Sequence, residues 1–253
     1  MGGESDGAFP RALRVRLNVM PSPNHLLSRL LRTSPEAAGH LERVNLSTGL
    51  WPTLDTADDG DHLYFPETGL MGLFWTGKPS TSVGMALLGR HACWWPGHWR
   101  SSPLQTQVLQ AGQAQRIRWS LLQAEPQRYA AWLLQAAAAS QQLIQQMAQQ
   151  AFCAHNHNRL QRLASGLLVV LHQNPHSTHP LTVAELAHWL ACAEAEVLAA
   201  AQSLQAHGAL QLTVGAGTGA QLHSLQSQPL TRLACSCHVQ GVSGPGPSGS
   251  VQG

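Results

Sequence analysis

The chain has 253 residues and a formal net charge of +2 at pH 7. This length is enough for one large or two medium domains with well-filled cores. Charged residues make up only 11% of the chain, compared with roughly 25% in ordinary domains. The small net charge therefore favours neither a strongly basic nucleic-acid-binding protein nor one that captures acidic substrates.

The first segment is predicted to be a disordered arm covering residues 1–22. It contains Gly, Ser and Pro together with Arg11, Arg14 and Arg16, and it lacks the continuous apolar stretch of a signal peptide. A nucleic-acid-binding arm is the alternative for these arginines. No later stretch reaches the ~18 apolar residues of a membrane helix. We therefore expect a cytoplasmic protein with no membrane partner.

Residues 23–120 are predicted to form an antiparallel β domain that begins with two short helices. The helices are expected over Asn24–Leu31 and Ser34–Val44, because Ser34 and Pro35 fit a helix cap and first turn. From Val44 to Ile117, short alternating runs are separated by Gly, Pro and Asp, as in antiparallel sheets. The clearest predicted strands are Leu63–Phe65, Leu70–Trp75, Gln107–Leu109 and Ala114–Ile117.

Tryptophans are concentrated in the β domain, above all in the segment 93–100. Large rigid aromatic rings suit a ligand pocket, because they offer much contact area at low entropic cost. We favour a structural role, in which they fill the interior of the β domain or cover a dimer contact. If a ligand binds, its expected pocket residues are Trp75, Arg90, Trp94, Trp95, Trp99, Arg100 and Gln105.

Residues 121–153 are predicted to form a long dimerisation helix that starts near Ala124, with Pro126 in its first turn. Apolar and small residues recur alternately four and three positions apart, which is the spacing of a coiled-coil seam. The seam residues are Leu133, Ala137, Ser140, Ile144, Met147 and Ala151. This pattern predicts a parallel homodimer.

Residues 154–228 are predicted to form a winged helix-turn-helix. A first helix covers Arg159–His172, and Thr182 with Glu185 forms a capping box that starts the next one. A further helix has its apolar face at Val197, Ala200, Ala201 and Leu204 and stops at Gly208.

The alternating runs Leu210–Val214 and Ala220–Leu225 flank the glycine-rich 215–219 and predict a hairpin, or wing. Residues 229–253 are rich in Gly, Ser and Pro and are expected to be a flexible tail, disordered beyond about His238.

Short motifs along residues 22–238 recur in a characteristic order and spacing. They are Asn24–Leu27, His62–Gly69 with its Tyr-Phe-Pro-Glu, Leu88–Arg90, Arg116–Ile117, Arg159–Ala164, the helix-turn-helix and Cys235-Ser-Cys237. This ordered set resembles the Crp/Fnr superfamily of bacterial transcription regulators. The resemblance implies an α+β fold with an N-terminal cyclic-nucleotide-binding-like β-roll as sensor domain, a dimerisation helix and a C-terminal winged helix that binds DNA.

The resemblance also implies which residues face DNA. By family position they are Thr182, Ala193, Glu194, Glu196, Leu198 and Gln202. From Leu163 to Thr231 the chain has no Lys or Arg, and cations that displace counterions from phosphates supply much of DNA affinity. Two functions follow: a homodimeric DNA-binding transcription regulator, or a degenerate member with little DNA binding that acts as a dimeric protein- or ligand-binding module.

The effector cannot be named from the sequence. In nucleotide-binding relatives an arginine pairs with the cyclic phosphate, and the corresponding position here is Gln105. We therefore expect no cyclic-nucleotide binding and leave a small-molecule effector open. The chain also contains no nucleophile elbow, phosphate-binding loop or HExxH motif, and we expect no enzymatic activity.

The five cysteines are Cys93, Cys153, Cys192, Cys235 and Cys237. None precedes Cys93, so an iron–sulfur sensor of the Fnr type is not expected. The segments 153–157 (Cys-Ala-His-Asn-His) and 235–238 (Cys-Ser-Cys-His) contain zinc-ligand types, but neither has the paired spacing of a structural zinc site. We therefore predict no metal and no other cofactor. A redox or metal responder acting through Cys235, Cys237 and His238 is a third hypothesis.

Overall fold

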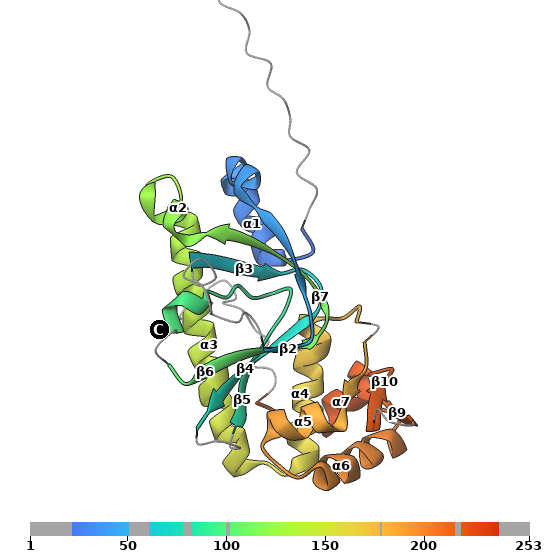
Figure 1. The fold of residues 1–253 in the computed structure, drawn as a ribbon. Helices are drawn as coiled ribbons and strands as arrows, with labels where there is room; N and C mark the ends of the chain where they lie inside the picture. The colour runs from blue at the N-terminus through green and yellow to red at the C-terminus, as the bar shows by residue number, and fades with distance from the viewer. Residues whose placement is uncertain are drawn as a thin grey trace, which may run out of the picture.

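The chain folds into an N-terminal β-roll, a long helix beside it and a C-terminal winged helix (Figure 1). The computed structural model describes residues 22–50, 61–77, 82–99, 102–177, 179–215 and 219–237, except for the side chains at 98 and 99. In chain order the elements are α1 (His25–Thr33), the 3-10 helix η1 (Pro35–His40), β1 (Glu42–Leu46), β2 (Gly49–Leu50), β3 (His62–Pro66), β4 (Leu70–Thr76), β5 (Ser82–Leu88), the 3-10 helix η3 (Pro96–Trp99), β6 (Leu104–Gln110), β7 (Gly112–Arg118), α2 (Trp119–Ala124), α3 (Ala130–Asn156), α4 (Arg159–Gln173), β8 (Leu181–Thr182), α5 (Val183–Leu190), α6 (Glu194–Ala206), β9 (Gln211–Gly215), β10 (Gly219–His223) and α7 (Ser227–Leu233).

The β-roll consists of two antiparallel sheets with strand orders β1-β7-β3 and β2-β6-β4-β5. Residues of both sheets share one apolar core, to which β4 contributes Met71 and Leu73 and β7 contributes Ala114. The register places Glu42 of β1 opposite Arg116 of β7, and their side chains form an ion pair of 2.8 Å. All four predicted strands of this domain are confirmed as parts of β3, β4, β6 and β7.

The N-terminal helix is tied to the β-roll through one buried amide. Asn24 caps α1 by accepting from the N–H of Leu27, and its Nδ2 donates to the carbonyl oxygens of Pro66 and Ala92 at 2.8 and 2.9 Å. The second predicted helix, Ser34–Val44, was too long. It is a single 3-10 segment, because the chain pairs as β1 from Glu42 onward and a strand residue cannot also be helical.

The long helix begins later than predicted. The expected start near Ala124 is where α2 ends, and α3 starts only at Ala130. Glu125 precedes Pro126 and has φ −126° and ψ 64°, which agrees with the steric bias of a residue before proline away from the helical region. None of the described helices is both long and apolar enough to cross a bilayer.

The predicted dimer seam is divided between two faces of α3. Leu133 and Met147 pack against the β-roll of their own chain, and Ser140 borders a cavity there. Ile144 and Ala151 are exposed instead, and Ala137 is exposed at the edge of the same cavity. The exposed stripe of α3 consists of Leu134, Ala137, Gln141, Ile144, Ala148, Ala151 and Phe152. Three of the six predicted seam residues therefore turn inward, toward the β-roll of the same chain.

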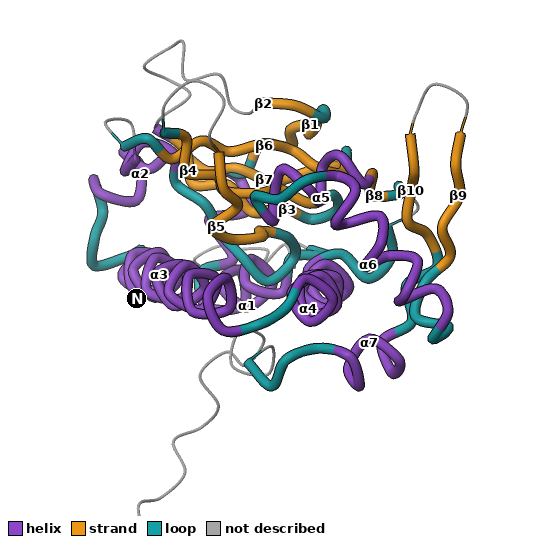
Figure 2. The backbone as a smooth tube through the Cα atoms, turned by 90° about the horizontal axis from the view of Figure 1, so that it is seen from below, coloured by secondary structure: helices purple, strands orange, loops and turns teal. Residues whose placement is uncertain are grey.

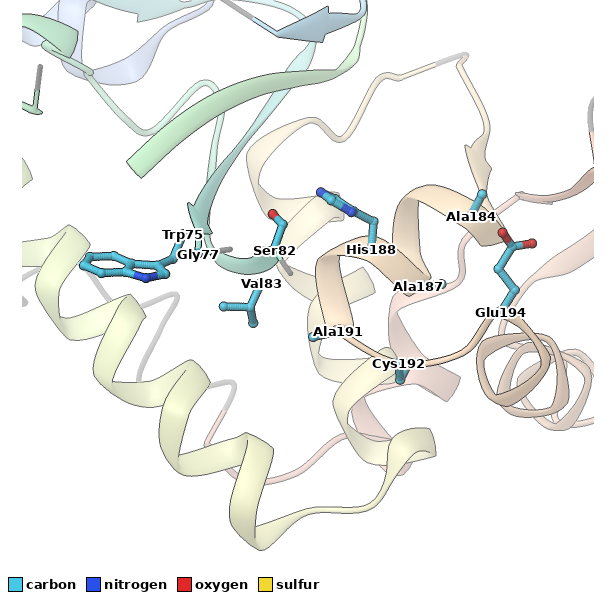
Figure 3. A pocket seen from close by; sticks show the side chains of 10 residues that line it. All are labelled: Trp75, Gly77, Ser82, Val83, Ala184, Ala187, His188, Ala191, Cys192 and Glu194. Carbon is cyan, nitrogen blue, oxygen red and sulfur yellow. The ribbon is translucent and has the colours of Figure 1, made fainter. Parts of the chain in front are cut away.

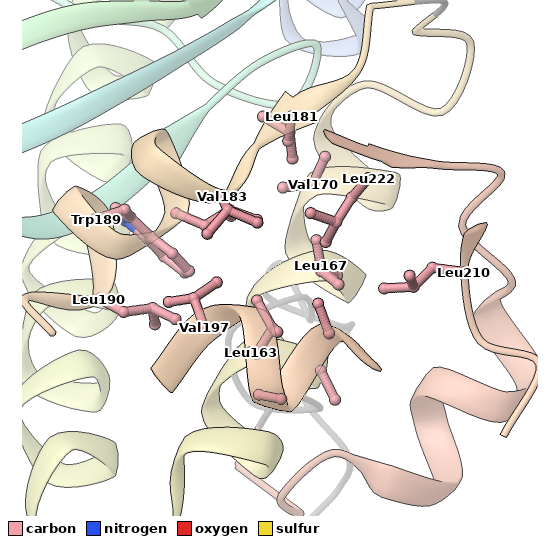
Figure 4. Packing of buried hydrophobic residues seen from close by; sticks show 14 of the residues in the cluster. Leu163, Leu167, Val170, Leu181, Val183, Trp189, Leu190, Val197, Leu210 and Leu222 are labelled. Atoms are coloured by element: carbon pink, nitrogen blue, oxygen red, sulfur yellow. The ribbon is translucent and has the colours of Figure 1, made fainter. Parts of the chain in front are cut away.

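The C-terminal domain is built around α4, which packs on α6 and α7 and carries Leu163, Leu167 and Val170 into its core (Figure 4). The wing sheet has the order β8-β10-β9 and adds Leu222 to this core. The predicted flexible tail from residue 229 was wrong at its start. Residues 227–233 form α7, which is held in place because Leu230 is fully buried.

The winged helix is docked on the β-roll through Trp189 of α5. A Cβ added to Gly84 of β5 would lie 1.8 Å from Cδ1 of the indole, and one added to Gly166 of α4 would lie 2.2 Å from its Cζ3. Phe74 of the β-roll belongs to the same buried cluster. Figure 2 shows α3 and α4 on one side of the strands. The two domains therefore share a continuous core.

Candidate nucleic-acid interface

The helix-turn-helix consists of α5 and α6 joined by a tight turn. Thr182 caps α5: its Oγ1 accepts from the N–H of Glu185 at 3.1 Å, and its own N–H donates to Oε2 of Glu185 at 2.8 Å. Ala191 adopts the left-handed conformation with φ +51°, which ends α5 and turns the chain toward α6. The predicted capping box is confirmed. The hydroxyl of Thr182 is therefore hydrogen-bonded within the domain.

The helix α6 presents a small, polar and uncharged face beyond its first turn. Its buried face is the predicted one, formed by Val197, Ala200, Ala201 and Leu204. Ala193, Glu194, Glu196 and Gln202 are exposed, as DNA-facing residues must be. Leu198 is half-buried and packs against the domain core. Ala195 and Ala199 are exposed as well, and their helical spacing to Gln202 places all three on one face.

The cations nearest to α6 are engaged within the protein. Arg159 forms an ion pair of 3.3 Å with Glu196. Arg162 is buried and donates from Nη2 to the carbonyl oxygen of Leu190 at 2.9 Å. Burial, and then the neighbouring charge of Arg159, lowers the pKa of Arg162. In the described part of the C-terminal domain, the exposed face of α6 therefore has no cation of its own.

The wing is a short two-stranded ribbon. In the register of β9 and β10, Thr213 faces Gln221 and Leu212 faces Leu222. Thr213 Oγ1 lies 2.9 Å from Nε2 of His223, and Val214 is 79% exposed near the tip. Such a ribbon can approach a duplex through its backbone N–H groups and polar side chains, which position a protein on DNA without reading its sequence.

The predicted ligand-pocket residues do not form one pocket. Trp94 and Trp95 border an apolar cavity of about 310 Å³ between the β-roll and α3, next to Leu133, Ala137 and Ser140. The ring of Trp95 stacks on Trp119 at 4.1 Å, and burial raises the pKa of the Cys93 thiol in the wall to about 12. Of the three cavities described here, it is the best ligand candidate, because aromatic and small apolar side chains line it.

The other predicted pocket residues are dispersed. Trp75 borders a cavity of about 870 Å³ between β4, β5 and α5, where His188 and Glu194 also lie (Figure 3). Gln105 borders a third cavity, of about 330 Å³, and accepts a hydrogen bond from Thr76 Oγ1. The side chain of Trp99 and all of Arg100 lie outside the described residues. We expected one pocket because most of these residues are close together in the sequence. In the structure they lie on different strand faces and loops, and they border different cavities.

Arg90 belongs to a histidine cluster at the junction of the two domains. His91 stacks between His25 and His172, with ring centroids 4.5 and 4.1 Å apart, and the guanidinium of Arg90 contacts the ring of His25. Backbone bonds also join the domains here, since the N–H of Arg90 donates to the carbonyl oxygen of Gln173. Burial, followed by the charges of His172, His25 and Arg90, lowers the pKa of His91 to about 4.

This cluster predicts that the domain junction weakens in acid. The unfolded chain takes up a proton at His91 near pH 6.5, whereas the folded chain does so only near pH 4. The free energy of unfolding therefore falls as pH drops through this window. Burial also lowers the pKa of His25 and His172 in the folded protein, so both residues act in the same direction.

Urea unfolding of the wild type and of His91→Asn at a series of pH values measures this effect. We expect a shallower loss of stability below pH 6.5 in the variant. His207→Asn, at the exposed end of α6, is the control and should follow the wild type. Parallel pH curves for wild type and His91→Asn would contradict the prediction.

The chain resembles known proteins in its fold and not in its sequence. No family model and no curated protein matches the sequence. Among solved structures, FixK2 from Bradyrhizobium japonicum is 13% identical with a TM-score of 0.59, covering 78% of this chain and 98% of that one. A Crp/Fnr-family regulator from Eubacterium rectale is 13% identical with a TM-score of 0.54, covering 80% and 93%. The c-di-GMP-responsive global regulator CLP from Xanthomonas campestris is 14% identical with a TM-score of 0.53, covering 76% and 99%.

Proposed function

We propose that this chain, which has the fold of the Crp/Fnr regulators, is a divergent member that acts as a homodimeric DNA-binding transcription regulator in the bacterial cytoplasm. The observation that carries the proposal is the complete domain order. A β-roll, a long helix and a winged helix occur in one chain, and the match extends over 93–99% of each of the three solved regulators. In this proposal α6 enters the major groove and the wing contacts the adjacent backbone.

The dimer interface of the proposal is the exposed stripe of α3. Leu134 is 72% exposed, Ile144 57% and Phe152 55%, which is unusual for large apolar side chains on a helix. Ala137, Ala148 and Ala151 lie between them on the same side. Small residues beside large apolar ones allow two helices to approach closely and pack as a coiled coil.

Charge introduced into this stripe is expected to separate the protomers. In Ile144→Glu the two copies of the helix would bring carboxylates into an apolar contact, so we expect a monomer by light scattering. Gln123→Glu, which adds the same charge at an exposed position of α2 outside the stripe, is the control. A wild type that is already monomeric, or an Ile144→Glu variant that remains a dimer, would contradict the proposed interface.

The β-roll is proposed to act without a cyclic nucleotide. The position that carries the phosphate-binding arginine in nucleotide-binding relatives is Gln105, which is exposed on β6. A buried cyclic phosphate needs a guanidinium or a nest of backbone N–H groups. The described residues that border the cavity beside Gln105 include no arginine or lysine. An apolar effector in the cavity of Trp94 and Trp95 fits the lining better.

A second function is favoured by the charge of α6. Glu194 and Glu196 are exposed in its first turn, and Arg159 is already paired with Glu196. A duplex repels such a face, because DNA binding depends on cations that release counterions. The alternative is therefore a dimeric module of the same fold that binds a protein or a small ligand and has little affinity for DNA.

Fluorescence anisotropy of the full chain with labelled genomic fragments separates the two functions. A regulator should bind at low salt, with log affinity falling by roughly 0.9 per phosphate contact for each unit of log salt. Binding that is weak and insensitive to salt, with and without a cell extract as a source of effector, would reject the DNA-binding function. The same result would support the protein- or ligand-binding module.

A further inference from the structure

Four potential metal ligands meet where α3 passes into α4. Cys153 lies in the last turn of α3, and His157 follows one turn later at the end of that helix. Cys235 and Cys237 lie in the segment after α7. The Sγ atoms of the cysteines and a ring nitrogen of the histidine all lie within 4.8 Å of one another. These residues are referred to below as the Cys3His cluster.

We propose that the Cys3His cluster binds one Zn²⁺ ion. Structural zinc sites are tetrahedral, and three thiolates with one imidazole are one of the usual ligand sets. With Zn–S bonds of about 2.3 Å and a Zn–N bond of about 2.0–2.1 Å, tetrahedral geometry places sulfurs about 3.8 Å apart and sulfur about 3.6 Å from nitrogen. The two sulfurs of Cys153 and Cys235 are 3.9 Å apart, and Nε2 of His157 is 3.3 Å from Sγ of Cys237.

Surrounding residues hold the ligands in place, as second-shell groups do in metal sites. Ser165 of α4 accepts from the N–H of Cys235 at 3.2 Å, and its Oγ lies 3.1 Å from the Sγ of the same cysteine. Gln149 of α3 donates from Nε2 to the carbonyl oxygen of Cys237. Phe152 packs edge-on against the ring of His157. Residues of α3 and α4 thus position both halves of the cluster.

The donor set favours zinc over other chemistries. Thiolates with imidazole in tetrahedral geometry select zinc, whereas magnesium and calcium prefer oxygen ligands. A single ion fits ligand atoms this close, while an iron–sulfur cluster holds its ligands further apart, around several irons. A disulfide between Cys153 and Cys235 would require their sulfurs, now 3.9 Å apart, to close to about 2.05 Å.

This proposal replaces the expectation, made from the sequence, that the protein binds no metal. Each half of the cluster has only two of the ligands, and 80 residues separate His157 from Cys237. His155 is exposed and is not part of the cluster, and His238 lies outside the described residues. Only the packing of α7 on α4 brings the tail back to the end of α3.

A zinc ion in the Cys3His cluster would restrain how the C-terminal domain is connected to α3. The turn between α3 and α4 is the connection between the long helix and the winged helix. A metal ion shared by the end of α3 and the segment after α7 would fix the angle between these two parts. Loss of zinc, or oxidation of the thiols, would release the C-terminal domain from this restraint.

Zinc binding by the reduced, full-length chain tests the proposal. The protein is stripped of metal, and Zn²⁺ is titrated in competition with a chromophoric chelator. We expect one ion per chain and, with Co²⁺ in its place, the visible absorption bands of tetrahedral thiolate coordination. Zinc should also raise the thermal midpoint, because it binds only the folded arrangement.

Two ligand variants and a matched control make the test specific. Cys237 and His157 are both half-buried. We expect Cys237→Ser and His157→Asn each to weaken zinc binding by more than 100-fold. This loss exceeds the roughly 10–100-fold loss that follows removal of a second-shell group. Cys192→Ser, a half-buried cysteine outside the cluster, should bind zinc like the wild type. Circular dichroism of each variant establishes that it is folded.

Two outcomes would overturn the proposal. One is a reduced wild-type chain that binds no zinc under these conditions. The other is a folded Cys237→Ser or His157→Asn variant with the zinc affinity and the Co²⁺ spectrum of Cys192→Ser. Neither outcome depends on DNA binding, so the zinc site and the proposed regulatory function can fail separately.

Discussion

Replacing Trp189 with alanine is expected to lower the free energy of unfolding by about 3–5 kcal/mol, as large aromatic truncations in cores do. The indole is 3% exposed and fills the space between Gly84 of β5 and Gly166 of α4. Its removal leaves a cavity that two rigid backbones cannot close. The loss is read from urea or thermal unfolding followed by far-UV circular dichroism.

A double-mutant cycle shows whether this loss belongs to the domain contact. Gly84→Ala places a methyl group against the indole and should cost about 1–3 kcal/mol by overpacking. In the Trp189→Ala background the same methyl group meets a cavity, so its cost should largely disappear. Trp75→Ala, at a ring that is 45% exposed, is the control and should change stability by about 0.5–1 kcal/mol at most. Additive effects of Gly84→Ala and Trp189→Ala would show that Trp189 does not join the domains.

The double substitution Ala193→Arg and Glu194→Arg is expected to give the chain strong, salt-dependent DNA binding. Both positions are exposed at the start of α6, and the change adds three units of positive charge to each protomer. A dimer would gain four arginines. If each contacts a phosphate, the slope of log affinity against log salt becomes steeper by about 2–4, since each contact contributes roughly 0.9.

Anisotropy titrations at several salt concentrations measure this slope. The matched control is Glu125→Arg with Ala131→Arg, which adds the same charge at exposed positions near the start of α3. The control should bind DNA only slightly better than the wild type. An equal gain in both double variants would mean that α6 is not the DNA-facing helix and that net charge alone decides binding.

Local patterns determined most of the secondary structure of this protein. The capping box of Thr182 and Glu185, the stop at Gly208 with its φ of +68°, and the alternation of the wing strands each depend on neighbours a few residues apart. The same holds for the buried face of α6. Helical and strand periodicities are properties of short segments, and a single chain therefore reveals them.

Where two local signals competed, the outcome depended on the surrounding structure. Pro126 suits a first helical turn, yet the chain interrupts the helix there and restarts it at Ala130. Heptad spacing in α3 was visible, but which side of the helix faces its own β-roll was not. The direction of a helix face is set by the sheet that packs against it, and spacing alone contains no information about that sheet.

The sequence by itself determined the order of the elements, the scarcity of cations on the winged helix and the aromatic character of the β-roll. Only the tertiary structure decided that the tryptophans face separate cavities, that Trp189 joins the two domains, and that Cys153 and His157 lie beside Cys235 and Cys237. These are contacts between segments far apart in the chain. Such contacts form when apolar surfaces of whole elements are buried together, so no short stretch of sequence specifies them.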